Sequence, residues 1–522
     1  MNRYTPVWLF IVFLIFFLLC GCAEAPGEIE SEMREEGELL TVRLPGGDWG
    51  FPTPFAHYAR GPGVSHMRYI FDSLLEKDEN GLIPWLAEDY EILDEGTRYL
   101  FYLQPDVHWH DGTALTADDV TFSFNYYREH LPVWIDDPLI LSDDYLLSVE
   151  SKAESTVEFV LAAPNATFLE KAGRLPIIPA HIWSEIERPD EFNDPEALTG
   201  SGPYILNNYS KEHGTYRYAA NQQYWGPQPR IDILEFIPVS DEVLTLENGD
   251  IHFARVPADL LERFTDNPLY EIMEQPAFWG YRIRFNMVGL PEFQQKELRQ
   301  AFALAINREE LVEKIARGQG IPGSMGMLSP DHRWFNHNLP AYEYDSGKAT
   351  EILSSLETPA RESYELLVGE DAEVRIGELL KEQLARAGIN LTVAPADLKT
   401  RDSRIIEGNY ELVLVGHGLW GTDPDYLRQR YSEETEDWLN GTPGYNNSAF
   451  SKLAEKQVRE MDEEKRREII MEMQEILADD VPDIPLYLRV TVNIYRRDIY
   501  DGWIHIYDHH EPTHNKLSYL ER

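Results

Sequence analysis

The pattern of apolar and polar positions predicts a body that mixes helices and strands. Across residues 298–317, apolar side chains recur at the spacing of a helix face. Asn307 is predicted to be an N-cap within this stretch, with Glu310 three residues later to complete a capping box. Thr116 and Asp119 form a similar pair, which predicts the start of another helix.

The second half of the chain alternates between strand-like and helical patterns. Strand-like runs occupy residues Tyr364–Val368, 390–393 and 410–415, and the helical stretch after the first run covers residues 372–387. Strands that alternate with helices favour a parallel sheet. A long, charged amphipathic pattern over residues 449–478 predicts one helix or a pair of helices.

The N-terminus has the pattern of a secretion signal. Residues 9–19 are wholly apolar, which is short for a membrane span but typical of the central region of a signal peptide. Cys20, Gly21 and Cys22 follow, and this stretch resembles a lipobox in which Cys22 is the lipid acceptor. Residues 23–38 are rich in Glu, Gly and Ser and are expected to form a flexible tether. An uncleaved anchor helix is the alternative.

Composition narrows the class of function. The chain has 522 residues with 46 Lys+Arg and 91 Asp+Glu, a formal net charge of −45. Nucleic acid and anionic membrane surfaces are excluded as partners, because both require clustered cations. The 43% hydrophobic content suits folded cores, and the length predicts two or three lobes. Without cysteines beyond Cys22, the mature chain has no disulfide and no thiol nucleophile.

Motifs for catalysis are almost absent. The chain has no phosphate-binding P-loop, no GxGxxG after a strand and no GxSxG elbow. Residues 510–514 spell HExxH, but Pro512 lies inside the helix that a zinc protease would need. A surface tail, or an adventitious metal site, is favoured over a metalloprotease.

Several segments, in order, resemble the extracellular solute-binding proteins that serve peptide and nickel ABC importers. These are LAEDY at 86–90, YLFYL at 99–103, VHWHDGTALTADDV at 107–120, GSGPY at 200–204, FN at 285–286, the stretch 298–308, and YD with KA within 344–349. Together they span about residues 40–510.

The resemblance implies an α/β, periplasmic-binding-protein type II fold, with two lobes, a hinge and an inserted subdomain. The resulting division is residues 1–22 signal peptide, 23–38 tether, 39–80, 205–281 and 485–522 lobe I, 81–204 inserted subdomain, and 282–484 lobe II. It also implies an extracytoplasmic monomer, held to the cell membrane by a lipid anchor. The permease and ATPase subunits of an importer are the implied partners.

The resemblance is less specific about the ligand. Peptide-binding relatives carry a strand ending in Gly-Trp, followed by an Asp that pairs with the amino group of the ligand. Here His417 stands where Trp is expected, Trp420 stands near the expected Asp, and Asp423 comes later. The stretch from Trp420 to Pro424 is more similar to a loop of nickel-binding relatives.

In nickel-type relatives, Arg and Trp side chains from the inserted subdomain also bind the carboxylates of a chelator. Arg128, Trp134 and Arg174 lie in plausible corresponding regions, and His417 is a candidate ligand for a chelated metal. We therefore expect a small peptide or a nickel chelate as ligand, with no resident cofactor and no enzymatic activity. A secreted hydrolase or a surface sensor on the same fold are the alternatives.

Overall fold

The computed structural model describes residues 39–58, 63–132, 134–135, 138–275, 277, 279–369, 372–418, 423–432, 438–439, 441–504 and 515–521, with only the backbone described at Ala258 and His417. The predicted signal peptide and tether, Cys22, Trp420 and residues 510–514 lie outside this part of the chain. No helix within it is both long and apolar enough to cross a membrane.

The first lobe contains a four-stranded sheet with the order β1-β10-β9-β8. Its strands are β1 (Thr41–Gly46), β8 (Tyr204–Ser210), β9 (Thr215–Ala220) and β10 (Ile233–Pro238). β1 pairs in parallel with β10, and the partners Arg43 and Glu235 are 192 residues apart. A long segment is therefore inserted between two strands of one sheet.

The inserted segment forms an antiparallel sheet of its own, with the order β4-β5-β7-β6. Its strands are β4 (Ala87–Leu93), β5 (Arg98–Leu103), β6 (Leu146–Ala153) and β7 (Thr156–Leu161). Helix α3 (Ala117–Glu129) packs on this sheet, and the predicted capping box of Thr116 and Asp119 is confirmed. The remaining elements of this region are α2 (Gly63–Arg68), β2 (Leu75–Asp78), β3 (Gly81–Pro84), α4 (Phe168–Ala172) and α5 (Ala180–Trp183).

The second lobe contains a six-stranded sheet with the order β14-β18-β13-β17-β15-β16. Its strands are β13 (Trp279–Phe285), β14 (Gly320–Pro322), β15 (Tyr364–Val368), β16 (Leu391–Pro395), β17 (Leu412–Gly418) and β18 (Asp483–Arg489). β15 pairs in parallel with both β16 and β17, as the alternating pattern predicts. The helices are α7 (Lys296–Ala305), α8 (Arg308–Lys314), α9 (Ser346–Ser355), α10 (Ala372–Ala385), α11 (Leu398–Ile406), α12 (Tyr426–Tyr431), α13 (Ser448–Arg459) and α14 (Glu463–Asp480).

The helical pattern over residues 298–317 corresponds to two helices, α7 and α8. Asn307 caps α8 as predicted, since its side chain accepts a 2.9 Å hydrogen bond from the Glu310 N–H. The predicted capping box is wrong, because the N–H of Asn307 donates to Gln383 Oε1 at 3.0 Å. The Glu310 carboxylate instead accepts from Gln383 Nε2.

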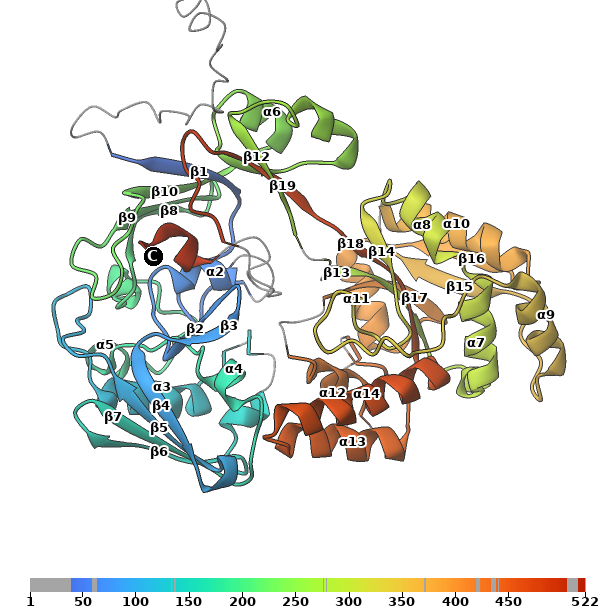
Figure 1. Cartoon of the computed structure of the whole chain (residues 1–522), viewed down its shortest axis with the longest axis horizontal. Coiled ribbons are helices and arrows are strands. Elements are labelled where there is room, and N and C mark those ends of the chain that lie inside the picture. The colour runs from blue at the N-terminus through green and yellow to red at the C-terminus, as the bar shows by residue number, and fades with distance from the viewer. Residues whose placement is uncertain are drawn as a thin grey trace, which may run out of the picture.

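Two segments connect the lobes. A small sheet beside the first lobe contains β11 (Phe253–Arg255), β12 (Tyr270–Glu274) and β19 (Val492–Arg496), and α6 (Glu242–Glu247) lies next to it. The chain passes from this sheet to the second lobe between β12 and β13, and returns between β18 and β19 (Figure 1). The predicted boundaries at 281/282 and 484/485 fall within β13 and β18.

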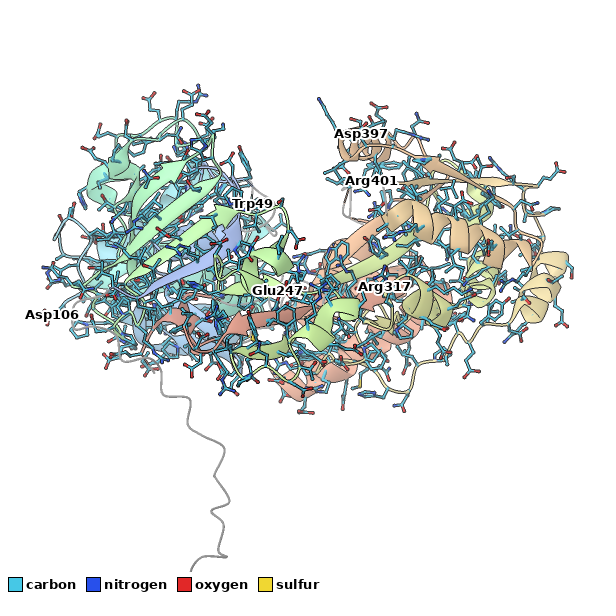
Figure 2. All side chains as sticks on the ribbon, turned by 90° about the horizontal axis from the view of Figure 1, so that it is seen from above. Trp49, Asp106, Glu247, Arg317, Asp397 and Arg401 are labelled. Atoms are coloured by element: carbon cyan, nitrogen blue, oxygen red, sulfur yellow. The ribbon has the colours of Figure 1, made fainter. Side chains whose placement is uncertain are left out.

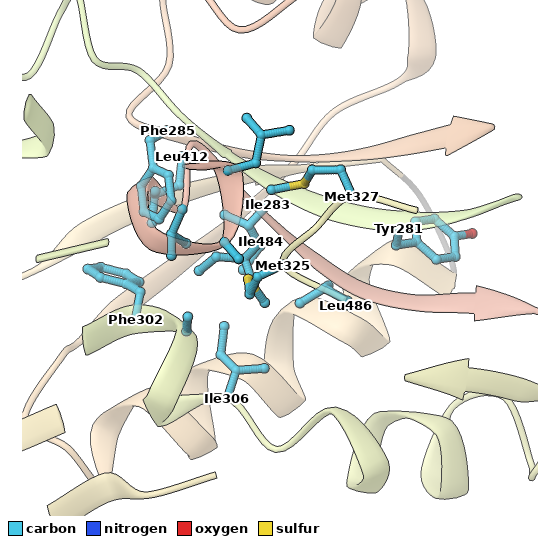
Figure 3. Packing of buried hydrophobic residues seen from close by; sticks show 14 of the residues in the cluster. Tyr281, Ile283, Phe285, Phe302, Ile306, Met325, Met327, Leu412, Ile484 and Leu486 are labelled. Atoms are coloured by element: carbon cyan, nitrogen blue, oxygen red, sulfur yellow. The ribbon is translucent and has the colours of Figure 1, made fainter. Parts of the chain in front are cut away.

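Each lobe has its own hydrophobic core. In the second lobe, Ile283 and Phe285 of β13 pack with Leu412, Ile484 and the helical residue Phe302 (Figure 3). A separate cluster fills the first lobe and its inserted sheet. Separate cores connected by two strand passages allow the lobes to move relative to one another.

Candidate ligand-binding site

A pocket of about 340 Å³ lies where the two lobes meet, and we call it the hinge pocket. The first lobe contributes Arg255 and Asp259, and the second contributes Arg375. The crossing strands contribute Tyr281 of β13 and Tyr487 and Arg489 of β18. Because the lining comes from both lobes, a change in the angle between the lobes would reshape this pocket.

The crossing strands present an aromatic face to the hinge pocket. Trp279 is the register partner of Arg489, and Tyr281 is the partner of Tyr487. The ring centroids of Tyr281 and Tyr487 are 5.7 Å apart, and the Arg489 guanidinium lies 5.6 Å from the Trp279 ring centroid. Burial raises the pKa of both tyrosines. Both hydroxyl groups therefore stay protonated at neutral pH and can donate hydrogen bonds.

Strand β17 leaves part of one edge unpaired beside this face. β15 pairs with β17 only at Leu412 and Val413. No other strand in the described part of the chain pairs with residues 414–418 on that side. Gly416 is required here, since a Cβ atom at this position would lie 2.3 Å from Cζ2 of Trp279. The Trp279 ring therefore lies directly against the β17 backbone.

The first lobe presents a hydrogen-bonded aromatic group just after β1. Asp48 accepts hydrogen bonds from Tyr209 Oη at 2.6 Å, Tyr58 Oη at 2.8 Å and the Gly50 N–H at 3.1 Å. Burial raises the pKa of Asp48, but these bonds lower it by more, so the carboxyl group is ionised at neutral pH. The neighbouring Trp49 lies on the side of the first lobe that faces the second (Figure 2).

The three candidates from the inserted subdomain lie apart from the hinge pocket. Arg128 pairs with Asp143 on the surface. Trp134 is buried and donates from Nε1 to the Pro54 carbonyl at 2.8 Å. Arg174 is only 6% exposed and lies 3.8 Å from Glu170. A role for these residues in ligand binding stays a prediction.

The candidates near the end of β17 differ in how far they are described. His417 is the register partner of Gly280, its side chain is not described, and Trp420 lies outside the described residues. Asp423 accepts two hydrogen bonds from Arg466, at 2.5 and 2.7 Å. Burial raises the pKa of Asp423, but Arg466 lowers it by more. The Asp423 carboxylate is therefore already paired with an arginine of its own lobe.

Asp423 borders a second space between the lobes, of about 440 Å³, which the β2–β3 hairpin and α14 also line. Beside it, Lys171 of α4 lies 2.6 Å from Asp425, and the Ala166 N–H donates to the Val458 carbonyl at 2.7 Å. Figure 1 shows α4 facing α12 and α13 at this second contact. The two lobes thus touch far from the crossing strands as well as at them.

Sequence reasoning did not identify Trp279, Tyr281, Tyr487, Arg375 or Arg489 as site residues. A signal was present, since the resemblance implies crossover strands at residues 280–286 and 483–490. These strands include Tyr281, Tyr487 and Arg489, and alternate residues of a strand share a face. In the described part of the chain, no group of three or more His, Cys, Asp or Glu side chains is arranged to hold a metal ion.

Comparison with known proteins identifies the class. The model of "Bacterial extracellular solute-binding proteins, family 5 Middle" matches residues 81–438. The chain is 26% identical over 471 residues to di/tripeptide-binding protein 1 of Pseudomonas aeruginosa, covering 83% of this chain and 86% of that protein. Two solved structures share the fold. One is DppA from Helicobacter pylori in complex with the peptide STSA (TM-score 0.74, 22% identity, 93% of this chain and 98% of that chain). The other is NikZ from Campylobacter jejuni in complex with Ni(L-His) (TM-score 0.72, 19% identity, 88% and 94%).

The fold is that of the type II periplasmic binding proteins. The chain belongs to the bacterial extracellular solute-binding proteins, family 5. It is therefore a solute-binding protein rather than an enzyme, and the solute-binding component of an ABC importer.

Proposed function

We propose that the chain captures a short peptide between its lobes and delivers it to the permease of an ABC importer. The observation that carries this proposal is the unpaired edge of β17 beside Trp279. An extended peptide can hydrogen-bond to such an edge as an added strand, and aromatic side chains can cover its side chains. The similarity to a di/tripeptide-binding protein over most of the chain supports the same ligand class.

Delivery would depend on closure of the lobes. A ligand that contacts both lobes shifts the equilibrium towards the closed arrangement by its difference in affinity for the two arrangements. The permease, with its ATPase, would then engage only the closed form.

The same proposal places the body outside the cell membrane as a monomer, attached through a lipid on Cys22. The apolar run at residues 9–19 and the tether at 23–38 support this placement. Radioactive palmitate should label the wild-type chain in cells, whereas Cys22→Ala should be unlabelled and released. Labelling of the variant would contradict the proposal.

The test of the ligand uses the chain from residue 23 onward, purified, denatured and examined by mass spectrometry together with elemental analysis. Peptides without metal are the expected result, followed by saturable quenching of Trp fluorescence when dipeptides and tripeptides are titrated. Gly416→Ala should weaken this binding because the new Cβ displaces Trp279. Recovery of a metal together with a small polycarboxylate or histidine would overturn the proposal of a peptide ligand in favour of a metal chelate.

A further inference from the structure

Three arginines stand out because their guanidinium groups have neither an acidic partner nor a hydrogen bond among the described residues. They are Arg255, Arg375 and Arg489, and all three line the hinge pocket. Most other described arginines form ion pairs; Arg317 of the same pocket pairs with Asp259. Arg489 instead rests over the ring of Trp279.

Unpaired arginines are unexpected at this composition. The chain has 91 Asp+Glu for 46 Lys+Arg, so a surface cation has many acidic groups within reach. Among the described residues that line the pocket, the two acidic side chains are engaged elsewhere, Asp259 with Arg317 and Glu242 with the backbone N–H of Arg255 at 2.8 Å. The cluster is therefore a local concentration of positive charge in a strongly negative protein.

The surrounding groups suit a carboxylate. Guanidinium groups match the planar geometry of a carboxylate and bind it with two parallel hydrogen bonds. The hydroxyl groups of Tyr281 and Tyr487, which line the same pocket, can add neutral donors. A pocket of about 340 Å³ has room for a side chain of a ligand whose backbone lies along the neighbouring β17 edge.

We propose that the hinge pocket is a specificity site for anionic ligands, so that the preferred peptide carries an acidic side chain. This inference rests on the proposed function as a peptide-binding protein. Arg255 belongs to the first lobe, Arg375 to the second, and Arg489 to a crossing strand. A carboxylate held by all three would favour closure, because it gains its full set of donors only when the lobes approach.

The test compares two dipeptides that differ only in charge, Ala-Glu and Ala-Gln, by titration calorimetry at low salt. Wild-type protein should bind Ala-Glu about tenfold more tightly, which is roughly 1.4 kcal/mol. The double variant Arg375→Gln/Arg489→Gln should bind Ala-Glu and Ala-Gln with equal affinity. Arg497→Gln removes the same charge from an exposed arginine that pairs with Glu271 outside the pocket, and should keep the preference.

The outcomes separate the two proposals. Equal affinity for Ala-Glu and Ala-Gln in wild-type protein would overturn the specificity site and leave peptide binding intact. A preference that survives in the double variant would also overturn it. Failure to bind any peptide, with a chelate co-purifying, would overturn the proposed function itself.

Discussion

The contact between α4 and α12 should set the balance between arrangements of the lobes. Lys171 reaches from the first lobe to Asp425 of the second at 2.6 Å, and their side chains are 18% and 2% exposed. Asp425 is also held within its own lobe by Arg428 at 2.8 and 2.9 Å and by Gln457 at 2.6 Å. Lys171→Met therefore removes the bond between lobes without leaving an unpaired buried charge.

The magnitude follows from the burial of the pair. A hydrogen bond to a charged group contributes about 1.5–3 kcal/mol, and partial exposure of the lysine reduces this to about 1–2 kcal/mol. The equilibrium between this arrangement and those with α4 and α12 apart should shift by about 5- to 30-fold. Small-angle X-ray scattering of the ligand-free protein should show a larger radius of gyration, and peptide affinity should change.

The control is Lys152→Met, since Lys152 pairs with Glu150 and Glu158 inside the inserted sheet. Identical scattering and affinity in the two variants would refute the reasoning. Burial raises the pKa of Asp425, but Lys171 and Arg428 lower it by more, to well below its usual range. The ionised Asp425 carboxylate therefore contributes its full stabilisation above about pH 4, the pKa of an aspartate in the unfolded chain. This contribution is lost only as the pH falls through the lower pKa of Asp425 in the folded protein. Scattering of the wild-type protein should not change between pH 7 and 5.

Three further predictions concern stability, each measured by thermal or urea unfolding. The ammonium group of Lys516 lies 2.7 Å from the buried carboxylates of both Asp72 and Glu76, and Lys516→Met removes it. The free energy of unfolding should fall by about 3–5 kcal/mol, and a fall of less than about 1 kcal/mol would contradict this. Gly280→Ala places a Cβ 2.0 Å from a carbonyl oxygen of β18 and forces the crossing strands apart. The free energy of unfolding should fall by about 1–3 kcal/mol or more, and an unchanged melting temperature would argue against this. Burial lowers the pKa of His66 to about 3, so the unfolded chain binds a proton that the folded chain does not, and stability should fall as the pH drops below 6.5. Between pH 6 and 4, His66→Phe should reduce the slope of the free energy of unfolding against pH by about 1.4 kcal/mol per pH unit. An unaltered slope would exclude His66 as the source of the pH dependence.

Local patterns allowed much of the fold to be predicted. The strand Tyr364–Val368 has the predicted limits, and the helix predicted over residues 372–387 is α10 (Ala372–Ala385). The box at Thr116 forms because both of its bonds lie within four residues. The box at Asn307 does not form, because the backbone N–H of Asn307 donates its hydrogen bond to the side chain of Gln383, which belongs to a different helix. A pattern within one segment cannot show which distant side chain will compete for a hydrogen bond.

The candidate site depended on such distant contacts. Tyr281 and Tyr487 are partners only because β13 and β18 pair in one sheet. Asp423 was a ligand candidate on its sequence, but in the fold it is held by Arg466. Arg375 and Arg489 look like any other arginines in the sequence, and only the three-dimensional structure shows that neither has an acidic partner among the described residues.

By itself, the sequence determined the family, the mixed α/β class and the limits of several elements, because periodicity, caps and ordered motifs are properties of neighbouring residues. The tertiary structure decided which charges are neutralised and which remain available to a ligand. Electrostatic and hydrogen-bond partners are set by distances of a few ångströms between segments far apart in the chain, and folding alone brings those segments together.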